Sequence, residues 1–125
     1  MTPSHALFKE LYSVLPIIGQ TFDYLPEAGT KYPFIYIGEI YNREIPNSEL
    51  LGEMTQIIHI YGLRTQRNQL EVWTAKVHNL LSSVKKIDGY RVALNDFDYR
   101  FIPDNTDVQP LLHYIINIRF KYNKE

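Results

Sequence analysis

The sequence predicts an α+β fold, in which a mostly antiparallel sheet of four strands, or slightly more, has two helices packed on one face. Two observations carry this prediction. Two segments have apolar residues at helical spacing, and each is followed by two segments in which apolar and polar residues alternate. This gives the order helix, strand pair, helix, strand pair. The composition also favours strands, with 10 Tyr and 6 Phe. A chain of 125 residues fits a single domain over residues 1–125.

The first helix is expected over residues 3–18. Thr2 can cap its N-terminus, and Pro3 suits the first helical position, where a backbone N–H would have no intrahelical partner. The side chains that share one apolar face are Leu7, Leu11, Val14, Leu15 and Ile18.

The second helix shows the clearest pattern in the chain. Asn68 and Glu71 have the spacing of an N-cap and its third helical residue, and Gly89 is placed for a left-handed C-cap. Between them one apolar stripe comprises Leu70, Trp73, Val77, Leu80, Leu81, Val84 and Ile87. The pattern therefore predicts a helix that continues to the residues just before Gly89.

Alternating residues predict four strands, at 33–42, 53–62, 90–101 and 110–121. The first of them is apolar on both faces, so it is expected to be central or to meet a partner on its second face. Polar residues 43–51 and the loop 102–110 are long connections for a chain of this size. Long loops without catalytic groups often serve as contact surfaces, and uncovered sheet edges invite pairing with another chain. These features indicate a subunit of an assembly.

Composition excludes several classes of protein. The net charge is -1, whereas nucleic-acid and anionic-membrane binders usually carry a basic excess. The chain has no cysteine, so disulfides and thiolate metal sites are excluded. No apolar stretch reaches the roughly 18 residues that span a bilayer, and the N-terminus lacks the features of a signal peptide. We therefore expect a soluble protein made in the cytosol, with no membrane partner.

Histidines are the first candidates for chemistry. His59 and His113 would be neighbours if their strands pair, and with a carboxylate such as Glu39 they could hold zinc. No short-spaced His-Glu-x-x-His motif supports that alternative, and half-buried or surface histidines are the favoured interpretation. A catalytic serine elbow and a glycine-rich phosphate loop are both absent from the sequence. The prediction is a protein without catalytic residues, metal or cofactor, with a small metal-dependent enzyme as an alternative.

Aspartates and arginines give further candidates. Asp96, Asp98, Asp104 and Asp107 match no calcium-loop spacing and are expected to serve turns through local hydrogen bonds. Arg64 and Arg67 precede the second helix, where they could bind an anion or a partner carboxylate, or simply lie in a solvated loop.

The order of these segments resembles the tail terminator proteins of long-tailed siphophages, also called tail completion or tail-to-head joining proteins. The resemblance runs from about residue 5 to 121, through "DYLPEAGTKYPFIYIGE", "TQIIHIYG", "QLEVWTAKVHNLLSS", "GYRVALNDFDYRFIPDNTD" and "LLHYIINIRFKY". Its sharpest points are Pro33, the pair Gly38-Glu39 and the run His59-Ile60-Tyr61-Gly62.

The resemblance implies a non-enzymatic α+β protein of the virion. Such proteins form hexameric rings that cap the head-proximal end of the tail tube, end tube growth and offer the surface that joins the filled head. The implied partners are further copies of the chain, the major tail tube protein and the head–tail connector proteins, and DNA passes through the ring without specific binding. The protein would be made in the cytoplasm of the bacterial host. A head–tail adaptor or another protein-binding module of similar fold is the alternative.

Five charged residues are predicted to bind partners. We place the 43–51 insert, with Arg43, Glu44 and Glu49, at an axial contact with the tube or the connector, because it is long for so small a domain. Arg64 and Arg67 complete this set.

Overall fold

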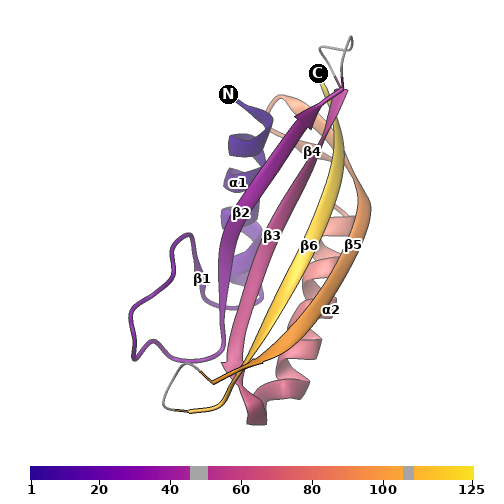
Figure 1. Cartoon of the computed structure of the whole chain (residues 1–125). Helices are drawn as coiled ribbons and strands as arrows, with labels where there is room; N and C mark the ends of the chain where they lie inside the picture. Colours follow the sequence, from indigo (N-terminus) through magenta and orange to yellow (C-terminus); the bar gives the residue numbers. More distant parts are fainter. Residues whose placement is uncertain (46–50, 106–108) are drawn as a thin grey trace.

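The computed structural model describes residues 1–45, 51–105 and 109–125 (Figure 1). Its strands form one six-stranded sheet in the order β1-β2-β3-β6-β5-β4. The elements are α1 (Pro3–Val14), the 3-10 helix η1 (Leu15–Ile17), β1 (Thr21–Phe22), β2 (Phe34–Glu44), β3 (Leu51–Leu63), the 3-10 helix η2 (Arg64–Gln66), α2 (Arg67–Ser82), β4 (Lys86–Ile87), β5 (Tyr90–Asp104) and β6 (Leu111–Lys124).

The α+β class is confirmed, but the mostly antiparallel four-stranded sheet is wrong. The sheet is mixed, because β1 runs parallel to β2 with Thr21 opposite Ile35, and it has six strands. β1 and β4 contain 2 residues each, which is too short for an alternating pattern to appear in the sequence. Backbone pairing holds them instead, as where the Ile35 N–H donates to the carbonyl of Gln20 at 2.9 Å.

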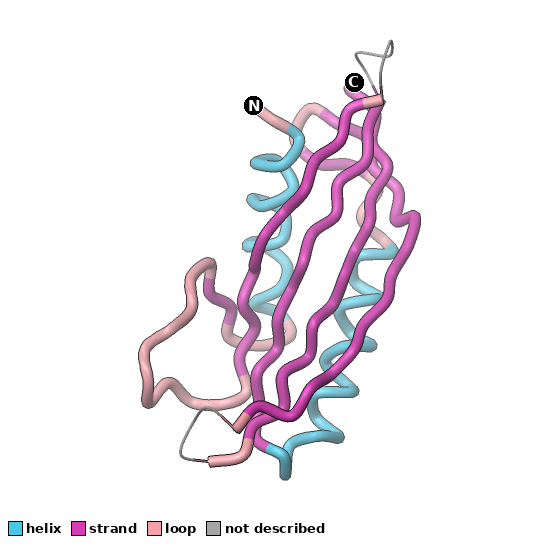
Figure 2. Tube along the Cα trace, in the orientation of Figure 1, coloured by secondary structure: helices cyan, strands magenta, loops and turns pink. Residues whose placement is uncertain are grey.

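Both α-helices lie on the same face of the sheet, α1 behind β2 and β3 and α2 behind β6 and β5 (Figures 1 and 2). The core fills the space between them. It includes Leu7, Leu11, Leu70, Trp73, Val77, Ile58, Ile60, Tyr114, Ile116, Ile118 and Phe120. Along β6 the alternation predicted from the sequence is confirmed, because the even-numbered residues from Leu112 to Phe120 are all buried. Within the part of the chain that the structure describes, no helix is long and apolar enough to cross a membrane.

The first helix begins as predicted and ends early. Thr2 is its N-cap, and the Thr2 hydroxyl accepts a hydrogen bond from the N–H of His5 at 3.2 Å. Regular α-helix stops at Val14, and Leu15–Ile17 continue as a 3-10 turn. Pro16 explains the change, since a proline lacks the N–H for an i to i−4 bond and its ring crowds the preceding turn.

The second helix differs from the prediction at both ends. It begins at Arg67 directly after η2, where the Gln66 side chain accepts from the N–H of Leu63 at 2.8 Å, so Asn68 is not the cap. It ends at Ser82, and the chain then forms the β4–β5 hairpin. Gly89 does adopt a left-handed conformation (φ 84°), but in the turn of that hairpin. Ile87 is buried, as its apolar character requires, but it belongs to strand β4 and not to the helix.

A β-bulge in β2 changes which side chains share a face. The register with β3 shifts between Ile37 and Ile40, so Ile40 lies opposite Gln56, on the helix side. Strict alternation along residues 33–42 would put Ile40 on the other face. The bulge overturns that assignment, because it inserts an extra residue that no period-2 pattern reveals. The buried Gln56 side chain supports the bulge by donating from Nε2 to the carbonyls of Gly38 and Glu39, both at 3.1 Å.

Gly19 determines how closely the end of the first helical segment approaches α2. A Cβ added at Gly19 would lie 2.2 Å from Cη2 of the Trp73 indole, a rigid ring that is largely buried. We predict that Gly19→Ala lowers the free energy of unfolding by about 1 to 3 kcal/mol through overpacking. Urea denaturation with the m-value monitored measures this change.

The matched control places Gly19→Ala in a Trp73→Leu background. Because the smaller side chain removes the clash, the cost of the alanine should fall in the double variant. An equal cost in both backgrounds would show that Trp73 is not the cause.

Candidate functional site

The face of the sheet that the helices leave uncovered, here called the open face, carries the main cluster of ionisable side chains. The side chains of alternate residues in β3 and β6 lie on this face, and most of them are half-buried because they pack against one another. At its centre are Tyr36, Ile57, His59, Tyr61, His113 and Ile115. This face therefore combines apolar packing with two histidines from neighbouring strands.

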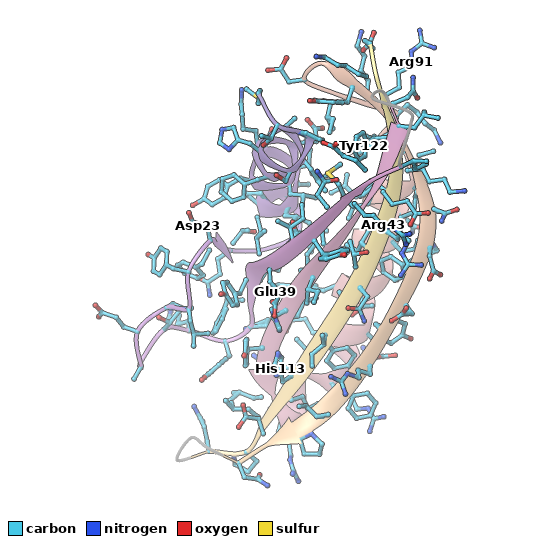
Figure 3. The ribbon with its side chains drawn as sticks, turned by 45° about the horizontal axis from the view of Figure 1, so that its top comes forward. Asp23, Glu39, Arg43, Arg91, His113 and Tyr122 are labelled. Carbon is cyan, nitrogen blue, oxygen red and sulfur yellow. The ribbon has the colours of Figure 1, made fainter. Side chains whose placement is uncertain are left out.

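Glu39, His59 and His113 form a chain of hydrogen bonds on the open face, here called the histidine cluster. His59 Nδ1 lies 2.7 Å from His113 Nε2, and His59 Nε2 lies 3.0 Å from Glu39 Oε1. The three residues come from the bulge of β2, from β3 and from β6, and Figure 3 labels its two ends, Glu39 and His113. Gly38 makes room for it, because a Cβ there would lie 2.8 Å from the His59 ring.

Stacked rings hold the histidine cluster in place. The Tyr61 ring stacks on His113 with centroids 4.1 Å apart and an interplanar angle of 13°, and Tyr36 stacks on His59 at 5.3 Å. Burial, together with the neighbouring charge of His59, lowers the pKa of His113 to about 4. The pKa of Glu39 is lowered by a hydrogen bond from its own backbone and by the bond from His59. His113 is therefore neutral near pH 7.

The hydrogen-bond geometry counts against a zinc site. Both hydrogen bonds form when His59 Nε2–H donates to Glu39 and His113 Nε2–H donates to His59 Nδ1. His59 then uses both ring nitrogens in hydrogen bonds within the cluster. The donor atoms of Glu39, His59 and His113 therefore do not converge on one position where a zinc ion could bind. Among the described residues, no group of three or more His, Cys, Asp or Glu could hold a metal ion.

The predicted partner-binding residues do not form one site. Arg43 and Glu44 end β2 beside the start of β3, whereas Arg64 follows the other end of β3. A strand of 13 residues separates these two ends by roughly 40 Å. Arg67 packs its guanidinium 4.5 Å from the centre of the Phe101 ring, so it also contributes to a cation–π contact. Glu49 lies outside the described residues.

Two strand edges are the feature that the sequence did not locate. β1 covers β2 only at Ile35 and Tyr36, and β4 covers β5 only at Tyr90 and Arg91. No other strand within 1–45, 51–105 and 109–125 pairs with the outer sides of these two strands, which form opposite borders of the long antiparallel sheet (Figure 2). Large exposed apolar side chains gather on them, namely Ile40 and Tyr41 on β2 and Tyr99, Phe101 and Ile102 on β5.

Comparison with known proteins gives a match at the level of the fold. The sequence matches no protein-family model. It also matches no curated protein sequence. Among solved structures, the chain is similar to a chain from the virion of a native gene transfer agent (GTA) particle, with a TM-score of 0.58 and 11% identity. The similarity covers 95% of this chain and 94% of that chain, so the whole architecture is shared and not a fragment of it.

Because His113 is half-buried and has a lowered pKa, we predict that acid destabilises the protein. An unfolded His113 binds a proton near pH 6.5, whereas the folded one does so only near pH 4, so protonation between these values favours unfolding. His113 thus contributes to a loss of stability as the pH falls from about 6.5 to 4. After allowance for solvent screening of a half-exposed ring, we expect this contribution to be about 1 to 2 kcal/mol. Urea denaturation at pH 7 and pH 4.5 measures it.

His113→Gln should reduce the difference in stability between the two pH values, and His5→Gln, which removes an exposed histidine of α1, is the matched control that should retain it. An unchanged difference in His113→Gln would refute the role of His113.

Proposed function

We propose that this protein is a structural virion protein that forms a ring at the head-proximal end of a long non-contractile tail tube. There it would end tube growth and provide the surface that joins the head. The observation that carries the proposal is the similarity of nearly the whole chain to a chain of a phage-like virion particle. The resemblance of the segment order to siphophage tail terminators supports the same role and makes it more specific.

The two uncovered edges support ring formation. Contacts between unlike surfaces of identical subunits build either a closed ring or an open filament, and β2 and β5 offer two such unlike surfaces on opposite borders of the sheet. The terminator resemblance points to closure at about six copies. A ring built this way leaves both ends of the long strands free to meet other rings along the axis.

The charged residues at the two ends of the sheet fit two axial partners. Glu44 lies at one end, and Arg64 and Arg67 lie at the other. One end would face the major tail tube protein and the other the head–tail connector. DNA would pass through without specific contacts, because a chain of net charge -1 offers little overall attraction to phosphates.

The histidine cluster supports a structural role over a catalytic one. Its hydrogen bonds are satisfied internally, and the low pKa of His113 makes this ring a poor base near neutral pH. A head–tail adaptor remains the second candidate, because a ring of the same fold could join two other rings. The two roles differ in whether the protein stops the growth of a tube.

Adding the protein to tail-tube subunits from its own particle while they polymerise tests the proposed role. We predict that tube elongation stops and that electron micrographs show an extra ring at one end of each tube. Arg64→Glu, which reverses an exposed charge at one axial end, should weaken binding to one axial partner by about tenfold or more and leave binding to the other unchanged.

The control variant is Lys76→Glu on α2, which reverses an exposed charge away from both ends of the sheet. Tubes that elongate normally in the presence of the protein, with the protein bound only to heads, would favour the adaptor and contradict the terminator.

A further inference from the structure

The two uncovered edges both direct the backbone N–H and C=O groups of alternate residues outward, away from their own sheet. In an antiparallel pair, alternate residues direct their N–H and C=O groups to the neighbouring strand. The Ile45 N–H donates to the carbonyl of Leu51, so by alternation Arg43 and Tyr41 face β3. The backbone groups of Ile40, Asn42 and Glu44 therefore point outward from β2.

The backbone groups of β5 alternate in the same way. The Glu125 N–H donates to the carbonyl of Gly89, which means that odd-numbered residues of β6 face β5. Their partners beyond the bulge include Asp98, opposite Asn117, and Arg100, opposite Ile115. By alternation the outward backbone groups of β5 belong to Phe97, Tyr99 and Phe101.

We propose that β2 of one copy pairs antiparallel with β5 of the next copy, with Ile40 opposite Phe101 and Arg43 opposite Asp98. The proposal rests on the ring assembly proposed above and names the contact that builds it. Antiparallel neighbours alternate through β2, β3, β6 and β5, so adding β2 of a second copy to β5 continues that alternation. The helices of both copies then lie on the same side of one continuous sheet.

Charge and shape complementarity favour this register. It sets the Arg43 guanidinium opposite the Asp98 carboxylate and the Tyr41 ring opposite Arg100, where opposite charges and a cation–π contact are both favourable. It also places the exposed side chains of Ile40 and Phe101 against each other on the helix side. Strand 40–44 then lies opposite the regular segment 97–101, between the bulges of the two strands.

Registers shifted by two residues are less favourable. One shift sets Arg43 opposite Arg100, where like charges repel each other. It also sets Ile40 opposite Pro103, which has no N–H to donate to the added strand. The opposite shift sets Glu44 against Asn95, inside the β5 bulge between Leu94 and Asp96, where regular pairing is interrupted. The β5 bulge and Pro103 thus favour the proposed register over these two neighbours.

Disulfide trapping tests this contact, because the natural chain contains no cysteine. In the proposed register, residues 43 and 98 form a pair without backbone hydrogen bonds between them, with Cα atoms about 4.5 Å apart, well within the range of a disulfide. Within one copy β3 and β6 separate β2 from β5, which spaces these strands by about 14 Å and excludes an internal bridge.

We expect the double variant Arg43→Cys/Asp98→Cys to form, under mild oxidation, a reducible ladder of covalent multimers that ends at the closed ring. Arg43→Cys/Arg100→Cys, shifted by two residues, is the matched control and should cross-link at least about tenfold less. Arg43→Cys alone should give no product larger than a dimer. A ladder of equal yield in the shifted variant would overturn the register.

Combining trapping with solution mass and the tube assay separates this proposal from the proposed function. Rings that form without the 43–98 disulfide would overturn the edge contact and leave the ring role standing. A 43–98 ladder in the double variant, with a natural chain that does not stop tube growth, would support the contact and contradict the terminator. Monomers without any disulfide at every concentration, and in the presence of tubes, would contradict both.

Discussion

The antiparallel pairing of β3 with β6 is the constraint on which the rest of the structure depends. Every residue of β3 has a partner on β6, from Leu51 opposite Asn123 to Leu63 opposite Leu111. In this register the even-numbered residues of both strands enter the core and the odd-numbered ones face away from the helices. A slip by one residue would send residues such as Ile58 and Tyr114 to the open face and would dismantle the core.

Three surfaces with separate tasks follow from that pairing. The helix side holds the apolar core and carries most of the stability. The open face brings His59 and His113 together on neighbouring strands, because Tyr61, two residues beyond His59, pairs directly with His113. The borders β2 and β5 are left with exposed apolar side chains, which suits contacts between subunits better than it suits an isolated monomer.

Much of the fold could be predicted from the sequence where a pattern is long and regular. The alternation from Leu112 to Phe120 and the Thr2 cap both appear in the structure as expected. The proximity of Glu39, His59 and His113 also followed from placing two histidines on strands that pair. Their detailed arrangement did not, because a hydrogen-bond chain and a metal site use the same residue types and differ only in where the ring nitrogens point.

The remaining features depend on contacts that a local pattern does not record. Strands β1 and β4 are too short to show a period, and they exist because longer neighbours offer them backbone groups. The β2 bulge depends on Gln56, which is distant in sequence and supplies the donors for its carbonyls. The apolar stripe that predicted a longer second helix includes Ile87. This residue is buried because it lies in β4, after the chain has left the helix.

The mass of the protein in solution, measured by light scattering over a concentration series with and without isolated tail-tube ends, tests the central claim most directly. A chain of 14.7 kDa that forms closed rings should give one discrete assembly of about six subunits, with a ring shape in negative stain. A monomer at every concentration, including in the presence of tube ends, would contradict the account.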